Sequence, residues 1–179
     1  MQQKFYYYTM QFGIYMGLLI TLNFILSSSS NSLLSFFSWI VWGAEMALLY
    51  YFTLKYRRQE TNDILTYGQS FRFIFMTYIF GALLATALRI VYLKWINPEV
   101  LTELFNQSMQ ALDKVSVPDK NAVKDALATF LKPVQYSFLY LWIDLFAGVL
   151  YALVIAAFTR KTDRNANQPQ QQDDEDIVG

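Results

Sequence analysis

The chain has 179 residues, with no cysteine and no histidine, and with 14 basic and 14 acidic side chains that give a net charge of zero. These facts exclude thiol nucleophiles, disulfides, imidazole bases and ordinary zinc sites, and they give no general attraction to nucleic acid. Hydrophobic residues make up 55% of the chain and charged residues only 16%, whereas a soluble domain has about 25% charged residues. The composition therefore predicts a membrane protein. Because the chain also has no known catalytic motif, we expect no enzymatic activity and no cofactor or metal.

Four apolar runs have the length that a helix needs to cross a bilayer, roughly 20 residues. They are residues 9–26, 33–54, 71–96 and 134–159. The first run resembles a signal peptide, but it is long for the apolar part of one and contains Gln11 and Asn23. We therefore expect a retained helix. If this helix were cleaved, three spans would remain. A serine-rich turn joins the first two runs as an antiparallel hairpin. The predicted fold class is an all-α integral membrane bundle of four transmembrane helices.

The polar segment 97–132 separates the third and fourth runs and has the pattern of an amphipathic helical hairpin. Apolar residues recur at helical spacing in two stretches: Val100, Leu101, Leu104, Phe105, Met109 and Leu112, then Val123, Ala126, Leu127, Phe130 and Leu131. Pro98, Pro118 and Pro133 stand at the expected boundaries. We expect this segment to form a lid packed on its own bundle. Its apolar stripes can instead lie on the membrane surface or bind a partner.

The distribution of basic residues predicts the topology. With four spans, one side of the membrane has eight basic residues: Lys4, Lys55, Arg57, Arg58, Arg72, Arg160, Lys161 and Arg164. The other side has five, and an excess of Lys and Arg marks the cytoplasm. Both termini are therefore expected to be cytoplasmic. We expect one membrane domain over residues 1–162 and a disordered, acidic, Gln-rich tail over residues 163–179.

Three charged residues, Glu45, Arg89 and Asp144, fall inside the apolar runs. At a rise of roughly 1.5 Å per residue, all three lie in one layer between the outer half and the middle of the bilayer. Charges at that depth are costly and rarely face lipid. We expect an Arg89–Asp144 pair, with Glu45 as the second candidate partner. The cluster either fixes the register of two helices, which is the interpretation we favour, or binds a cation, a proton or a basic head group.

Small residues at a spacing of four predict close helix contacts. In two of the spans a charged residue shares one helix face with two small residues. These sets are Gly81, Ala85 and Arg89 in the third span, and Asp144, Gly148 and Ala152 in the fourth. Gly13 and Gly17 form a GxxxG pattern in the first span. This pattern indicates helix packing within the chain more strongly than self-association, although a homo-oligomer is compatible with it.

The block YGQSFRFIFMTYIFGALLATALRIVYLKWINPEVL resembles the central part of an uncharacterised bacterial four-helix membrane family, domain of unknown function 4199. Gly68, Ser70 and Phe71 match its entry into the third span, and Asn97 and Pro98 match its exit. The resemblance in layout covers residues 9–161. It implies a small four-helix protein of the bacterial inner membrane, and it transfers no catalytic residue.

For function we expect an accessory or scaffolding component of a membrane complex, which binds another membrane protein through residues 98–132 or through the tail. The alternative is a small oligomeric transporter, or a protein that handles a lipid-linked intermediate, using Glu45, Arg89 and Asp144. An intramembrane enzyme is the third class. A transporter needs a cavity that reaches the buried carboxylates, whereas a scaffold needs a closed interior and an exposed apolar patch. An enzyme needs a further polar group that converges on them.

Overall fold

The computed structural model describes residues 2–29, 32–114 and 119–161, and the regular secondary structure within them is helical. The helices are α1 (Gln2–Ser27), α2 (Ser32–Glu60), α3 (Tyr67–Val91), α4 (Glu99–Asp113), α5 (Lys120–Phe130) and α6 (Pro133–Thr159), and a π-helical turn, η1 (Tyr92–Ile96), continues α3. The expected spans 9–26, 33–54 and 134–159 lie within α1, α2 and α6, and the expected span 71–96 is covered by α3 together with η1. The expected tail, 163–179, and Pro118 lie outside the described residues.

Three of the helices in the described part of the chain are long and apolar enough to cross a membrane: Gln3–Ser27, Tyr67–Ile96 and Pro133–Thr159. They correspond to the first, third and fourth expected spans. Helix α2 has 29 residues but is not among them. Glu45 interrupts its apolar run, and the helix ends in the charged sequence KYRRQE.

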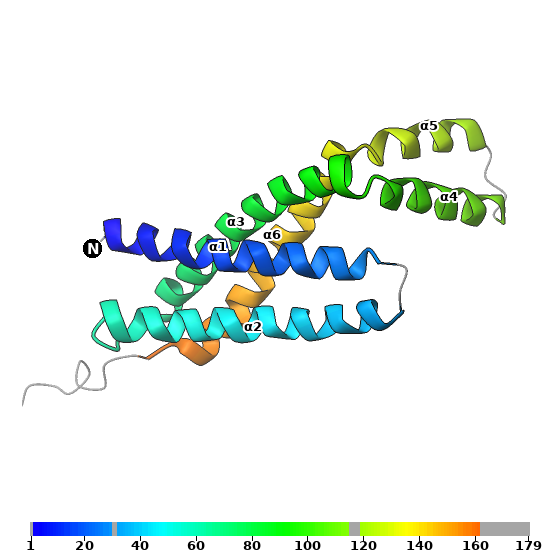
Figure 1. Ribbon diagram of the computed structural model, residues 1–179. Coiled ribbons are helices and arrows are strands. Elements are labelled where there is room, and N and C mark those ends of the chain that lie inside the picture. The colour runs from blue at the N-terminus through cyan, green and yellow to red at the C-terminus, as the bar shows by residue number, and fades with distance from the viewer. Residues whose placement is uncertain (1, 30–31, 115–118, 162–179) are drawn as a thin grey trace, which may run out of the picture.

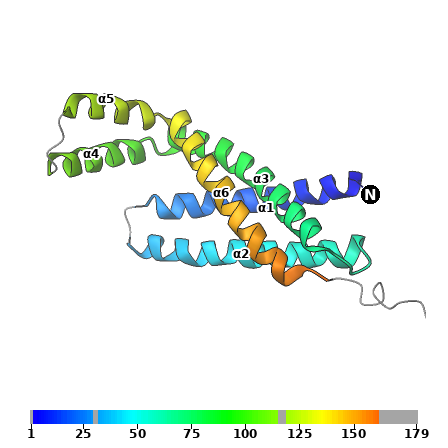
Figure 2. The ribbon, with the colours of Figure 1, turned by 180° about the vertical axis from the view of Figure 1, so that it is seen from behind.

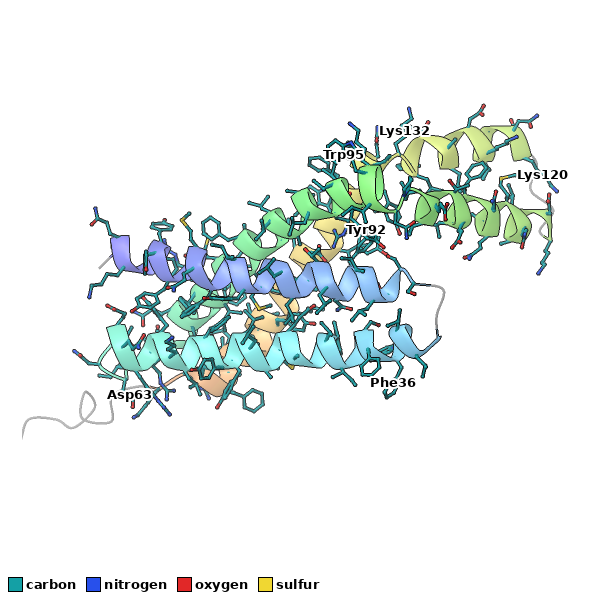
Figure 3. The ribbon with its side chains drawn as sticks, in the orientation of Figure 1. Phe36, Asp63, Tyr92, Trp95, Lys120 and Lys132 are labelled. Atoms are coloured by element: carbon teal, nitrogen blue, oxygen red, sulfur yellow. The ribbon has the colours of Figure 1, made fainter. Side chains whose placement is uncertain are left out.

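The long helices form two antiparallel pairs, α1 with α2 and α3 with α6. The second pair crosses the first diagonally, as Figures 1 and 2 show from opposite sides. Helix α3 packs extensively on both α1 and α6, whereas α2 packs mainly on α1 and makes few contacts with α3 and α6. We call the end of the bundle that carries α4 and α5 the hairpin end, and the opposite end the terminal end. Phe36 points away from the bundle near the hairpin end of α2 (Figure 3).

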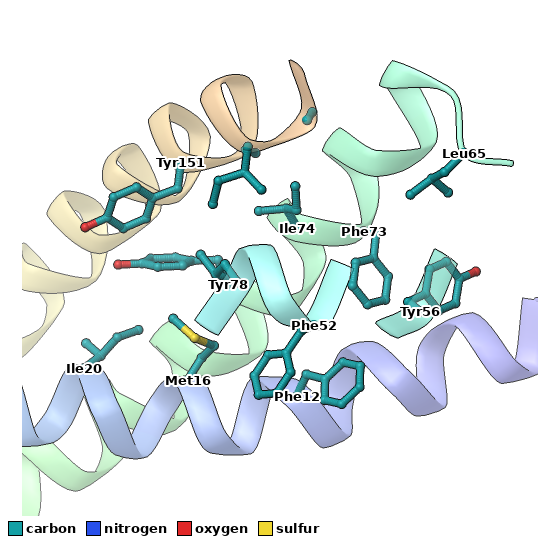
Figure 4. Packing of buried hydrophobic residues seen from close by; sticks show 14 of the residues in the cluster. Phe12, Met16, Ile20, Phe52, Tyr56, Leu65, Phe73, Ile74, Tyr78 and Tyr151 are labelled. Carbon is teal, nitrogen blue, oxygen red and sulfur yellow. The ribbon is translucent and has the colours of Figure 1, made fainter. Parts of the chain in front are cut away.

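The hydrophobic core lies where the two pairs cross (Figure 4). Phe12 of α1 stacks on Phe52 of α2 with ring centroids 4.2 Å apart, and Tyr56 of α2 stacks on Phe73 of α3 at the same distance. Aromatic pairs of this kind add to the burial of apolar area. The core therefore ties α2 to the bundle near the terminal end, and the contact loosens toward the hairpin end.

Glycines allow α1 and α3 to approach each other closely. A Cβ atom built on Gly17 would lie 2.8 Å from the carbonyl oxygen of Gly81 and 2.9 Å from the Cβ of Leu84. A Cβ atom on Gly13 would lie 2.6 Å from the Cβ of Phe80. Because real Cβ atoms do not approach that closely, a larger residue at either position would force the two helices apart.

The loop between α2 and α3 holds the end of α6 at the terminal end of the bundle. The backbones of Leu65 and Lys161 exchange two hydrogen bonds of 2.9 and 2.8 Å. Arg57 donates from Nε to Oδ1 of Asp63 over 2.9 Å and from Nη1 to the carbonyl oxygen of Thr159 over 2.8 Å. The ammonium group of Lys161 contacts the other carboxylate oxygen of Asp63.

Helices α4 and α5 form the expected hairpin, but it is not a lid over the bundle. The hairpin projects past the ends of α1 and α2 (Figure 1). Leu101, near the start of α4, is buried with Phe24 and Leu93, whereas no residue of α5, all of which the structure describes, is buried. The π-turn and Pro98 end α3 and redirect the chain, since the amide of Asn97 bonds to the carbonyl of Tyr92 instead of continuing the α-helical pattern. The expectation of a packed lid is therefore wrong for α5.

Candidate functional site: a charged cavity between the helix pairs

Arg89 of α3 forms an ion pair with Asp144 of α6. Its Nη2 atom lies 3.1 Å from Oδ2 of Asp144. The side chain of Arg89 is 1% exposed and that of Asp144 is 12% exposed. Breaking a pair buried to this extent leaves an uncompensated charge, which is strongly destabilising. The pair therefore joins α3 to α6 at one level of the bundle.

Two aromatic rings enclose the guanidinium group of Arg89. Its Cζ atom lies 4.7 Å from the ring centroid of Phe24 on α1 and 4.7 Å from that of Tyr140 on α6. These distances are within the range of cation–π attraction, which strengthens when the cation is removed from water. The rings replace part of the solvation that Arg89 loses on burial, and they leave its nitrogen atoms available for hydrogen bonds.

The hydrogen bonds of Arg89 are incomplete. Its Nε and Nη1 atoms are buried and have no partner among the described residues. A guanidinium carries five N–H donors, and a buried donor without an acceptor costs roughly 1–3 kcal/mol, more when it is charged. The fixed fork of Arg89 therefore offers two strong donor atoms to any acceptor that enters beside them.

Glu45 of α2 lies on the other side of the same site. It is 2% exposed, and its Oε1 atom accepts a hydrogen bond of 3.0 Å from Nδ2 of Asn23 on α1. Among the ion pairs of the described residues, none includes Glu45. The carboxylate of Glu45 is thus held in place by an amide and has no cationic side chain of its own.

A cavity of about 230 Å³, which we call the charge cavity, connects these groups. Its volume is far above the roughly 10–15 Å³ that one water molecule requires. Each long helix supplies one charged or amide side chain to the lining: Asn23 from α1, Glu45 from α2, Arg89 from α3 and Asp144 from α6. The remaining lining residues are Ile20, Phe24, Ser27, Trp42, Tyr78, Tyr140, Ile143 and Ala147.

The rim of the charge cavity is apolar on the side between α2 and α6. Trp42 and Ile143 line the cavity and are 50% and 52% exposed on the surface of the bundle. Helix α2 makes few contacts with α6, and one of them is the packing of Trp42 on Tyr151, with ring centroids 6.1 Å apart. The apolar part of the cavity lining therefore reaches the surface of the bundle at Trp42 and Ile143.

A polar groove lies beside the charge cavity at the hairpin end. This groove of about 370 Å³ lies between the serine-rich turn after α1 and helix α4, and Ser27 and Tyr140 line both it and the charge cavity. The groove also has Glu103 and Gln107 of α4 in its lining. Ser27 and Tyr140 are therefore the residues at which the groove adjoins the charge cavity.

The structure brings the three charges expected from the sequence to one cavity, but only Arg89 and Asp144 pair directly. Gly81, Ala85 and Ala152 are buried, and Gly148 packs against the ring of Tyr78, whose Cδ1 atom would lie 2.5 Å from an added Cβ. Sequence reasoning missed the roles of Asn23, Phe24 and Tyr140. Asn23 could have been identified because it is a polar residue inside an apolar run. Nothing in the sequence distinguished Phe24 and Tyr140 from the other aromatic residues.

Among the residues that the structure describes, no group of His, Cys, Asp and Glu is arranged to hold a metal ion. Comparison with curated proteins and with solved structures found no match. A family model does match, and it covers residues 11–161, which is most of the chain and includes every polar residue of the charge cavity. The chain therefore belongs to the family described as protein of unknown function DUF4199.

Proposed function

We propose that this protein is a four-span protein of the bacterial inner membrane that binds a polar group of a small or lipid-linked molecule in the charge cavity. In this proposal α2 also crosses the membrane, as the second of four spans, both termini are cytoplasmic and the hairpin end faces outward. The eight basic residues that the four-span arrangement collects on one side support this orientation. A protein with this site can act as a carrier, or as a receptor that presents its ligand to a partner.

One observation carries the proposal: two donor nitrogens of Arg89 are buried at the cavity without a protein acceptor. A cluster that served only to fix helix register would be expected to satisfy its own hydrogen bonds, since buried polar groups in proteins almost always have partners. Unused donors on a residue that lines a cavity instead support an acceptor that belongs to a ligand. A cavity of about 230 Å³ also differs from the closed interior expected of a purely scaffolding bundle.

The absence of cysteine allows a direct test of access to the cavity. Ala147 lines the charge cavity, whereas its neighbour Phe146 is 68% exposed on the lipid-facing side of the same helix. We expect Ala147→Cys to react with a membrane-impermeant thiol reagent added from outside, because a thiol becomes nucleophilic only where water can ionise it. Phe146→Cys is the matched control and should stay unlabelled. Equal reactivity of the two variants, or no reaction at either, would contradict a water-accessible cavity.

The same approach tests the number of spans. With four spans, Lys120→Cys at the tip of the hairpin should react from outside, and Arg58→Cys should react only after the membrane is permeabilised. If α2 stayed on the surface, the chain would cross three times and these two positions would exchange sides relative to the N-terminus. Labelling of Arg58→Cys from outside, or protection of Lys120→Cys, would therefore overturn the four-span arrangement.

A second candidate function is supported by the projecting hairpin. Helix α5 is without a buried residue along its described length, and Phe130 at its end is exposed. This surface suits an accessory protein that holds a partner in a membrane complex. A photo-crosslinking residue at position 130 should then give one discrete adduct in intact cells, whereas the same residue at the buried position 101 should give none. An identical pattern at both positions would count against this function.

A further inference from the structure

The charge cavity has two chemically different ends. At one end Arg89 presents unpartnered Nε and Nη1 donors, which suit an anionic oxygen because a guanidinium matches carboxylate and phosphate geometry with paired hydrogen bonds. At the other end Glu45 presents a carboxylate whose hydrogen-bond partner among the described residues is the amide of Asn23. A carboxylate without a cationic neighbour suits an ammonium group.

The charges of the cavity lining also exclude a simple anion as the best ligand. Arg89 and Asp144 neutralise each other, and Glu45 adds one negative charge, so the lining carries a net charge of −1 when all three groups are ionised. A free anion would gain the donors of Arg89 but would meet the uncompensated Glu45. A free cation would neutralise Glu45 but would leave the donors of Arg89 unused.

We propose that the charge cavity binds a zwitterionic group, with its anionic oxygens on Nε and Nη1 of Arg89 and its ammonium group on the carboxylate of Glu45. This inference rests on the proposed function, because it names the ligand class of the same site. A zwitterion satisfies both ends at once, and it adds no net charge to the cavity. The Arg89–Asp144 pair remains intact on binding, since Nη2 is already used by Asp144.

The exposed part of the cavity lining favours a lipid as the source of the zwitterion. Trp42 of α2 and Ile143 of α6 are apolar side chains that line the cavity and are half-exposed on the surface of the bundle. A phosphoethanolamine head group would enter beside these two residues while its chains stay in the bilayer. A water-soluble zwitterion of the same chemistry would instead use the polar groove beside Ser27 and Tyr140.

The experiment compares two lipids that differ in the head group. The full-length protein in detergent micelles is mixed with equal amounts of phosphatidylethanolamine and phosphatidylglycerol with identical chains, and the bound lipid is counted by native mass spectrometry. We expect the parent protein to retain phosphatidylethanolamine about tenfold more, a preference of about 1.4 kcal/mol. Glu45→Gln keeps the acceptor for Asn23 but removes the charge, so it should abolish this preference. Glu99→Gln, an identical substitution on the exposed start of α4, should leave it unchanged.

A second variant tests the anionic end. Arg89→Lys keeps the positive charge but replaces two fixed donor atoms by one ammonium group, so binding of both lipids should fall together. Thermal unfolding of every variant in detergent shows whether the protein is folded. Soluble glycerophosphoethanolamine, a phosphodiester with no net charge, forms a separate arm: if it binds and saturates the site while neither lipid does, the zwitterion assignment holds and the ligand is water-soluble.

Two results would overturn the assignment. One is equal retention of the two lipids by the parent protein with no binding of glycerophosphoethanolamine. The other is an unchanged preference in folded Glu45→Gln. Labelling of Ala147→Cys then distinguishes failure of the ligand class from failure of the proposed function. If the cavity is labelled, the ligand class is wrong but the proposed cavity stands, whereas an unlabelled cavity removes the proposed function itself.

Discussion

Asn23 of α1 donates a hydrogen bond to Glu45 of α2, with 3.0 Å between Nδ2 and Oε1, and this is the polar link between these two helices near the charge cavity. The bond explains why an apolar span contains an asparagine. It also fixes a carboxylate at the wall of a cavity without neutralising it. The arrangement differs from that at Asp144, which has a cationic partner.

We expect Asn23→Ala to lower the free energy of unfolding in detergent by roughly 1–3 kcal/mol, the cost of leaving a buried polar group without its partner. The cost should be smaller when Glu45 is already replaced by leucine, because the acceptor is then absent. Thermal unfolding of the two single variants and the double variant measures this coupling. Strictly additive losses would show that Asn23 does not stabilise the protein through Glu45.

The sequence predicted the common depth of Glu45, Arg89 and Asp144, because depth in a membrane helix follows from counting residues along an apolar run. It did not predict how Asn23 and Glu45 pair, since rotation of α2 about its axis depends on packing. The resemblance to the DUF4199 family is confirmed. The sequence marked the end of the third span by Pro98, but it did not predict the π-turn at Tyr92–Ile96 or the direction in which α4 and α5 project. That direction depends on one turn of altered hydrogen bonding together with the proline that follows it.

The Arg89–Asp144 pair should be strongly coupled. Arg89→Gln leaves the carboxylate of Asp144 buried without its cation, and we expect a loss of about 3–5 kcal/mol. Asp144→Asn should also destabilise the bundle, and the double variant should recover part of the combined loss. Thermal unfolding in detergent of this set measures the coupling energy. Full stability of both single variants would mean that the pair does not hold α3 to α6.

The contact between Phe24 and Arg89 has its own expected cost. Phe24→Leu keeps an apolar side chain but removes the ring face above the guanidinium, so we expect a loss of about 1–2 kcal/mol. In the background of Arg89→Gln the same change should cost clearly less, because no cation remains. Tyr140→Phe is the matched control, because it retains the ring and removes only the hydroxyl that accepts a 3.4 Å hydrogen bond from Tyr136. Its cost should therefore be the same in both backgrounds. An equal cost of Phe24→Leu in both backgrounds would assign it to packing alone.

The close approach of α1 and α3 depends on glycine. We expect Gly17→Ala to destabilise the protein by roughly 1–3 kcal/mol, because its Cβ would lie 2.8 Å from the backbone oxygen of Gly81, which cannot move alone. Gly43→Ala on α2 is the matched control, since an added Cβ there meets no atom within 4 Å. The control should be neutral or more stable by up to about 1 kcal/mol, as expected for alanine in a helix. Similar behaviour of the two variants would contradict the helix contact.

The contacts of Asp63 should make part of the stability depend on pH. The ammonium group of Lys161, followed by the guanidinium of Arg57, holds the pKa of Asp63 below its usual range. A group whose pKa is lowered by folding stabilises the folded state above its unfolded pKa, about 3.9 for aspartate. This contribution is complete at neutral pH, and it is lost as the pH falls through the lowered pKa of the folded protein.

Asp63→Asn is the appropriate variant, because residue 63 has a φ of 62° and asparagine tolerates this left-handed conformation. We expect the parent protein to be more stable than Asp63→Asn at neutral pH, and the difference to shrink as the pH drops below about 4. Asp125→Asn, at an exposed site of α5, is the control and should show no such convergence. A difference that stays constant down to low pH would mean that the carboxylate of Asp63 does not hold the end of α6 through its charge.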